Sequence, residues 1–331
     1  MRIRSRKAAV IALAATAALT LGSCSSSGGR EDTDTGGAAA GVADTPRIKI
    51  AMVTHAAPGD TFWDIVRSGA EAAAKKDNVD LNYQGAPEAA DQANLVQSAI
   101  DAKADGIAVT MAKPDAMAPT VKAAVDAGIP VTVLNGGIDA WQATGAIGYF
   151  GSNETVAGEA VGTRLSTEGA KKVLCVIQEQ GNVSLDARCA GVKNTFTGTT
   201  ENIFVTGTDM PSVQQSITSK LQQDPAIDRV VALGAPYALT AVKAIADAGS
   251  QAKVGTFDTN EELVKAIQGG TVEWAVDQQP YLQGYLAVDA LWLYKTNGNS
   301  IGGGQATLTG PAFIDSTNVD RVADFAAKGT R

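Results

Sequence analysis

Histidine is almost absent from this sequence: His55 is the only one in 331 residues. A Ser-His-Asp triad needs a histidine beside its nucleophile, and many transition-metal sites use several imidazoles. A single histidine argues against both kinds of site. We therefore expect no metal, no cofactor and no catalytic triad.

Basic residues are also in short supply, with 27 Lys and Arg against 35 Asp and Glu and a formal net charge of −8. Four of the basic residues fall within the first seven positions, so the rest of the chain is more acidic still. Proteins that bind nucleic acid usually carry a basic patch or stripe. The composition thus predicts no nucleic-acid partner.

Long apolar runs are missing after the N-terminus. The stretch from Ala8 to Thr20 follows a basic start and is too short for a confident bilayer span, which is typical of a secretory signal peptide. It ends in Leu21-Gly22-Ser23-Cys24, and this run resembles the bacterial lipobox, whose cysteine is lipidated. We expect a signal peptide at 1–23 and a lipid anchor on Cys24.

Residues 24–46 are rich in Ser, Gly, Ala, Asp and Thr and carry almost no large apolar side chain. Such a segment cannot bury a core, so it predicts a flexible tether. A lipid anchor with a tether places the folded body at the outer face of the cytoplasmic membrane. The lipid would be its only membrane attachment.

Cysteine is scarce as well, and two of the three lie in the body. Cys175 falls in an expected strand and Cys189 in the helix that follows it. Outside the cytoplasm, two cysteines on neighbouring elements can form a disulfide, although two buried free thiols are the alternative.

From Arg47 onward, short β-type runs alternate with helical patterns. Strand, helix and strand in repeated order indicate βαβ units, a parallel sheet and helices on both faces. The alternation starts again after Phe150, which predicts two α/β lobes of similar construction, each with a doubly wound parallel sheet. The expected strands are 48–53, 81–83, 106–109, 129–134, 173–177, 202–205, 229–233, 253–257 and 272–276. The expected helices are 60–76, 89–103, 115–127, 156–165, 185–196, 212–222, 237–248, 261–267 and 281–295.

Polar side chains follow several of these strands. They are Asp60, Asn135, Asp258 and Gln278, and the first stands just before an aromatic pair, Phe62-Trp63. Ligands of open parallel sheets bind at the carboxyl ends of the strands. Carboxylates and amides suit vicinal hydroxyls, and aromatic faces suit the C–H face of a sugar ring. Asp60 alone would be explained as a helix cap, but the four residues together favour binding of a polyhydroxylated molecule.

Residues 47–331 resemble the ribose/galactose-type periplasmic binding proteins of bacterial sugar importers, with the periplasmic binding protein type I fold. The resemblance rests on motifs in a specific order. They are Gly59-Asp60-Thr61-Phe62-Trp63, Ala104-Asp105-Gly106-Ile107, Ala127-Gly128-Ile129-Pro130-Val131, Val254-Gly255-Thr256-Phe257-Asp258, and 277–284. It implies a monomeric, non-enzymatic protein that delivers a monosaccharide or sugar alcohol to an ABC permease.

The resemblance also implies ligand roles for single residues. Besides the polar and aromatic residues at the strand ends, it points to Arg188, which lies near an arginine position of the family, and to Asp186, which aligns better with that position. It implies a hinge of three crossings, near 148–152, 278–280 and 310–314. The expected lobes are 47–150 plus 280–310 and 151–279 plus 311–331.

The sequence departs from the family pattern at two places. Gly234-Ala235-Pro236 replaces the usual Asn-Asp, and Gly136 stands where an arginine is common. The ligand therefore stays open among pentoses, hexoses, polyols, inositols and furanose-like signal molecules.

Three other functions are compatible with parts of the pattern. A receptor subunit for a sugar-like signal would have the same fold. A secreted carbohydrate-active enzyme could use Asp60 and Asp258 as paired carboxylates, yet nothing marks a nucleophile. A sugar-responsive repressor would need an N-terminal helix-turn-helix, where this chain has a signal-like segment.

Overall fold

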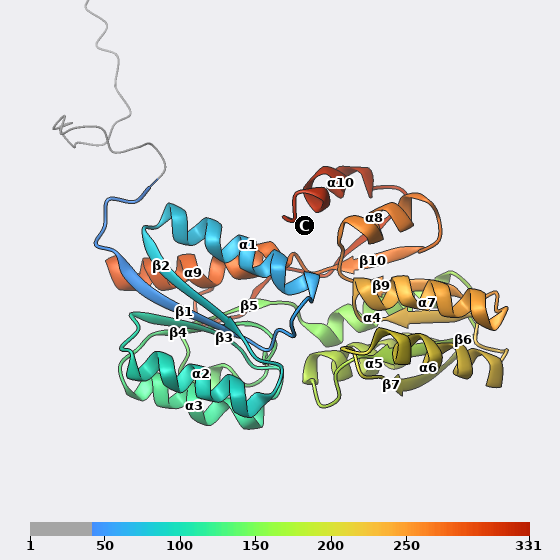
Figure 1. Cartoon of the computed structure of the whole chain (residues 1–331), viewed down its shortest axis with the longest axis horizontal. Helices are drawn as coiled ribbons and strands as arrows, with labels where there is room; N and C mark the ends of the chain where they lie inside the picture. The colour runs from blue at the N-terminus through green and yellow to red at the C-terminus, as the bar shows by residue number, and fades with distance from the viewer. Residues whose placement is uncertain (1–41) are drawn as a thin grey trace, which may run out of the picture. The chain divides into compact units, whose positions relative to one another are not determined.

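The computed structural model describes residues 42–331. The expected signal peptide, Cys24 and most of the tether lie outside these residues. Within them, no helix is both long and apolar enough to cross a bilayer. The described chain forms two six-stranded sheets, each covered by helices on both faces (Figure 1).

The first sheet has the order β11-β5-β4-β3-β1-β2, and all of its pairs are parallel. Its strands are β1 (Ile48–Thr54), β2 (Val79–Gly85), β3 (Gly106–Thr110), β4 (Val131–Asn135), β5 (Gly148–Gly151) and β11 (Thr307–Leu308). Helices α1 (Thr61–Lys76) and α9 (Pro280–Asn297) pack together on one face, and α2 (Ala89–Asp101) and α3 (Pro114–Asp126) on the other. A short 3₁₀ helix, η1 (Gln142–Thr144), follows β4. We call this unit the N-lobe.

The second sheet has the order β12-β10-β9-β8-β6-β7. Its strands are β6 (Lys172–Ile177), β7 (Thr199–Phe204), β8 (Arg229–Ala232), β9 (Lys253–Phe257), β10 (Trp274–Asp277) and β12 (Ala312–Asp315). Only β12 is antiparallel to its neighbour. The helices are α4 (Glu154–Thr167), α5 (Val183–Thr195), α6 (Met210–Gln223), α7 (Ala235–Ala248), α8 (Glu261–Gln268) and α10 (Asp320–Ala327). We call this unit the C-lobe.

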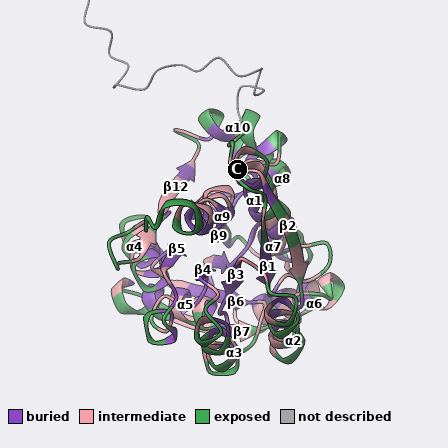
Figure 2. Cartoon of the chain, turned by 90° about the vertical axis from the view of Figure 1, so that its left-hand side faces the viewer, coloured by how far each residue is buried: buried purple, intermediate pink, exposed green. Residues whose placement is uncertain are grey.

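Local sequence explains these elements well. Every residue of β3 and β4 is buried, as expected for parallel strands covered on both faces (Figure 2). Several helices begin at an Asp or Asn whose side chain accepts a hydrogen bond from a backbone N–H of the first turn. These caps are Asp60, Asn153, Asn182, Asp209 and Asn260.

The two sheets repeat one order of strands, so β4 of the N-lobe corresponds to β9 of the C-lobe. This confirms the predicted fold class. The chain passes between the sheets three times, after β5, after β10 and between β11 and β12. The crossings touch one another at Gly310, where an added Cβ would lie 3.0 Å from both Ser152 Oγ and Gln278 Cα.

Five elements were not predicted: β5, β11, β12, η1 and α10. Strand β5 reads Gly-Tyr-Phe-Gly and is fully buried, so it shows no alternation. Strand β11 has only two residues, and β12 has four and follows Pro311. These three strands carry no strand pattern of their own in the sequence, and their place is set by the strands with which they pair.

The N-terminal end of the described chain is attached to the N-lobe. Ala43 N donates to Lys76 O at 2.7 Å, and Asn78 Nδ2 donates to Thr45 O at 2.9 Å. The indole of Trp292 donates to Thr45 Oγ1 at 3.1 Å. Residues 43–45 are therefore held against the ends of α1 and α9.

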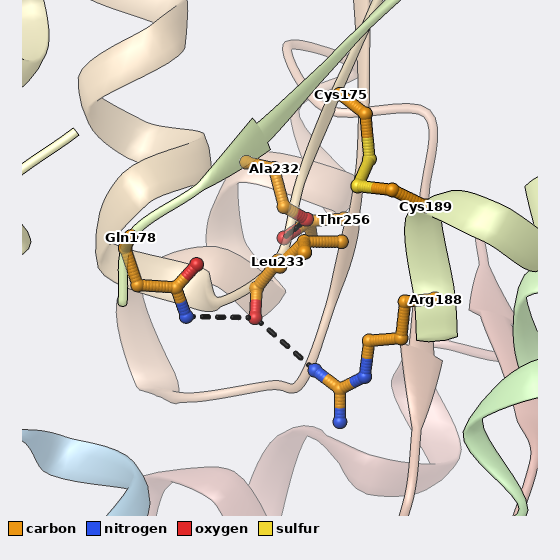
Figure 3. Close-up of a disulfide and its surroundings, with 7 residues drawn as sticks. All are labelled: Cys175, Gln178, Arg188, Cys189, Ala232, Leu233 and Thr256. Carbon is orange, nitrogen blue, oxygen red and sulfur yellow. Dashed lines mark hydrogen bonds between the residues drawn. A yellow bond between two sulfur atoms is a disulfide. The ribbon is translucent and has the colours of Figure 1, made fainter. Parts of the chain in front are cut away.

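The predicted disulfide is present in the structure. It joins Cys175 on β6 to Cys189 on α5, with 6.1 Å between the Cα atoms, and both residues are buried (Figure 3). The bridge lies beside Arg188 and so fixes the position of α5 against the sheet next to that side chain.

Candidate ligand site

A cavity of about 490 Å³ lies at the carboxyl ends of the strands and is lined by residues of both lobes. Seven of the eight ligand residues predicted from the sequence line it. They are Asp60, Phe62, Trp63, Asn135, Arg188, Asp258 and Gln278. Asp186 is exposed on α5 and is not among the lining residues. Arg188 lies two residues further along α5, on the opposite side of the helix, and lines the cavity. Whether these residues contact a ligand stays a prediction.

Asn135 and Asp258 hold equivalent places in the two lobes. Asn135 ends β4 and Asp258 follows β9, and both have left-handed backbone conformations, with φ of 63° and 66°. Asn and Asp tolerate this region better than other residues with a Cβ. The conformation turns the chain sharply at the strand end.

One row of hydrogen bonds connects these two residues through the second crossing. Asn135 Nδ2 donates to Gln278 Oε1 at 3.1 Å, and Gln278 Nε2 donates to Asp258 Oδ1 at 2.7 Å. Gln283, fully buried on α9, donates to the same Gln278 Oε1 at 2.9 Å. The row fixes the orientation of the Gln278 amide and holds three polar side chains along the cavity wall.

Arg188 and Glu154 form a buried ion pair below this wall. Arg188 Nε and Nη2 donate to the two carboxylate oxygens of Glu154 at 2.6 and 3.0 Å. Arg188 Nη1 donates to Leu233 O, which also accepts from Gln178 Nε2 (Figure 3). The guanidinium lies over the ring of Phe257, 4.4 Å from its centroid. Bidentate pairing fixes the arginine and satisfies its charge.

The negative charge of Asp258 is less well balanced than that of Glu154. Its Oδ2 lies 3.9 Å from Arg188 Nη1, which is beyond hydrogen-bonding distance. Burial raises the pKa of Asp258 to about 7, although Arg188 and Gln278 act in the opposite direction. The pKa of Asp60 is also raised, because its half-buried carboxyl is partly removed from water. The Oδ1 of Asp60 accepts from Phe62 N at 3.0 Å, so Asp60 is a helix cap that also lines the cavity.

Three aromatic rings form one side of the site. Phe62 and Trp63 meet edge to face, with centroids 5.0 Å apart, and His55 meets Trp63 in the same way at 4.6 Å. Trp63 also packs in the N-lobe core and is only 6% exposed, whereas Phe62 is half-buried. Burial lowers the pKa of His55 to about 4, so its imidazole is neutral at neutral pH.

Sequence reasoning missed several lining residues, among them His55, Lys113, Glu179 and Tyr237. His55 follows β1 directly, and that position was the available signal. The other three lie in loops or in a first helical turn that only the tertiary structure brings to the cavity. Lys113 of the N-lobe and Glu179 of the C-lobe form an ion pair at 3.2 Å.

The lobes also touch through backbone and polar side chains. Val183 N at the start of α5 donates to Ala112 O at 3.0 Å, and Asn260 Nδ2 donates to Thr61 Oγ1 at 3.4 Å. These contacts lie beside the cavity and enclose it from both lobes. Across residues 42–331, no three His, Cys, Asp or Glu side chains gather in a group suited to a metal ion.

Comparisons with known proteins agree with this geometry. A family model described as a periplasmic binding protein domain matches residues 50–299. A carbohydrate transporter from Acidothermus cellulolyticus, solved in complex with myo-inositol, is 56% identical, with a TM-score of 0.86 over 86% of this chain and 100% of that one.

Two curated proteins are more distant. The xylose/arabinose-binding protein of Sulfolobus acidocaldarius is 26% identical over 84% of this chain and 73% of its own length. A putative rhizopine-binding protein of Rhizobium meliloti is also 26% identical, over 70% of this chain and 79% of its own length.

Proposed function

This chain belongs to the periplasmic binding protein family, and we propose from this premise that its cavity captures a small polyhydroxylated ring for an ABC importer. The observation that carries the proposal is the row Asn135–Gln278–Asp258, which lines the same cavity as the aromatic rings of Phe62 and Trp63. Fixed amide and carboxylate groups can pair with neighbouring hydroxyls, while aromatic faces cover the ring carbons.

Within this class we propose a cyclitol of the inositol type as the preferred ligand. Support comes from the myo-inositol complex of the 56% identical transporter. Gly136 and Gly234, which have no side chain and stand where the sequence departs from the family pattern, agree with a ligand other than ribose or glucose.

Calorimetric titration of the purified protein with myo-inositol, ribose, glucose, xylose and arabinose tests this proposal. We expect myo-inositol to bind more tightly than the four aldoses. At a hundredfold excess over its dissociation constant, a ligand adds about 2.7 kcal/mol to stability, so a thermal shift gives an independent reading. Tighter binding of an aldose would reject the cyclitol assignment, and binding of none would reject the function.

We further propose that the protein does not transform its ligand. The support is the family itself together with the Arg188–Glu154 pair, which leaves neither group free for proton transfer. Prolonged incubation followed by NMR should return the ligand unchanged. A new resonance that depends on the protein would show turnover.

The remaining parts of the proposal concern location and movement. We propose that Cys24 carries the lipid anchor, and that the protein works as a monomer at the outer face of the membrane. The lobes, 47–150 plus 280–310 and 151–279 plus 311–331, would close about the three crossings when ligand binds. Substituting Cys24→Ala should move the protein from the membrane fraction to the soluble fraction.

A further inference from the structure

Each cation that lines the cavity already has an acidic partner. Lys113 Nζ lies 3.2 Å from Glu179 Oε1, and Arg188 is held by both oxygens of Glu154. The carboxylates are in excess among the lining residues of the described chain. They are Asp60, Glu88, Glu179 and Asp258.

In the described part of the chain, Asp60 and Glu88 are the two lining carboxylates without a cationic partner; Asp60 is half-buried, whereas Glu88 is exposed. Within residues 42–331 Asp60 forms no ion pair with a lysine, arginine or histidine. Its Oδ1 caps α1, whereas its Oδ2 accepts no hydrogen bond from residues 42–331, although the side chain lines the cavity. Asp258, 6% exposed, has one oxygen bound to Gln278 and the other 3.9 Å from Arg188.

The energetic consequence depends on the charge of the ligand. A carboxylate that is partly removed from water and has no cation beside it is destabilised in its ionised form, and a neighbouring positive charge relieves that cost. A neutral hydroxyl can donate to the same oxygen, but the bond is weaker than one from an ammonium group. An anionic ligand would meet these carboxylates and find no free cation among the described lining residues.

We propose that this site selects its ligand by charge, and that it prefers polyhydroxylated rings bearing a protonated amine over neutral rings, while rejecting rings with a phosphate or carboxylate. The amine would pair with Asp60 at the start of α1. This inference rests on the proposed function, because it assigns the charge of the ligand that the same cavity would hold.

Titration calorimetry at pH 7.5 with three kinds of probe tests the charge preference. The probes are myo-inositol, its monoamino analogues in which one hydroxyl is replaced by an amine, and myo-inositol 1-phosphate. We expect at least one amine to bind about tenfold more tightly than myo-inositol, as a charge-assisted hydrogen bond replaces a neutral one. The phosphate should show no measurable binding.

The substitution Asp60→Asn locates the effect, with Asp64→Asn as the matched control. Asparagine is also a good N-cap, so α1 should keep its start. Asp64 lies on the same helix, carries the same charge and is exposed outside the cavity. The ratio of amine affinity to myo-inositol affinity should fall about tenfold in Asp60→Asn, following the strength of the lost charge-assisted bond, and stay unchanged in Asp64→Asn.

The outcomes separate this inference from the proposed function. If myo-inositol binds but every amine binds more weakly, or the phosphate binds equally well, selection by charge is overturned and the proposed function stands. If both variants lower the ratio equally, the preference does not come from Asp60 and its assignment is overturned. If no probe of any charge binds, the proposed function fails together with this inference.

Discussion

The substitution Asp258→Asn should make the unliganded protein more stable at alkaline pH while it weakens ligand binding. Burial raises the pKa of this carboxyl from 3.8 to about 7. The folded state therefore holds a proton between these two pH values that the unfolded state has released. By proton linkage, the contribution of Asp258 to the free energy of unfolding falls as pH rises through this window, and it levels off above pH 7.

The size of the effect follows from the shift. One pKa unit corresponds to about 1.4 kcal/mol, so a shift of about three units amounts to roughly 4 kcal/mol above pH 7. At pH 5, which is only about one unit above the unfolded pKa, the loss of stability from Asp258 is roughly 1–2 kcal/mol. Asparagine has the size of aspartate and can still accept from Gln278 Nε2, but it carries no charge.

Urea unfolding of the wild type and Asp258→Asn at pH 5 and pH 8 measures the difference. We expect the variant to gain about 2–3 kcal/mol over the wild type between the two pH values. Other carboxyls with a raised pKa, such as those of Asp77 and Asp277, are present in both proteins, so their contributions to the free energy of unfolding cancel in the comparison. A variant that is equally or less stable than the wild type at pH 8 would refute the reasoning, because Asp258 would then carry no penalty.

Four further predictions can be checked directly. Phe62→Ala should weaken ligand binding with little loss of stability, while Trp63→Ala should also destabilise the fold by about 3 kcal/mol or more because Trp63 joins the core; calorimetry and urea unfolding separate the two effects. Replacing both Cys175 and Cys189 with alanine should cost about 3 kcal/mol, judged from the 14-residue separation, and a loss below 1 kcal/mol in urea unfolding would contradict it. Mass spectrometry of unreduced peptides should recover these two cysteines joined, and free thiols in exported protein would disprove the pairing. Small-angle scattering should show a smaller radius of gyration with saturating ligand, and an unchanged profile at confirmed occupancy would exclude closure.

Much of the fold could be predicted because the elements of the two sheets are long and carry their own signals. Strands such as β3 and β4 are continuous apolar runs between helices, and capping residues mark where the helices begin. The strands that escaped prediction are β5 and the two edge strands β11 and β12. Their pairing is decided by residues far away in the chain, as when Thr307 pairs with Phe150.

The residues of the cavity also include some that the sequence could predict and some that it could not. Residues directly after strands, such as Asn135 and Asp258, could be placed from the order of elements alone. Lys113 and Glu179 could not, because each belongs to a different lobe and their 3.2 Å pair depends on how the lobes meet. The choice between Asp186 and Arg188 depends on which side of α5 faces the cavity. The disulfide at Cys189 helps to fix that orientation, which the spacing of residues alone left open.

The contacts of residues 43–45 have a mechanical consequence. They fasten the start of the described chain beside the end of α1 and the last turns of α9, whereas the cavity lies at the opposite, carboxyl edge of the same sheet. A load applied through the preceding segment is thus carried by the N-lobe and enters far from the three crossings. The C-lobe bears none of that load directly, so an anchor at this end would leave the proposed closure of the lobes unhindered.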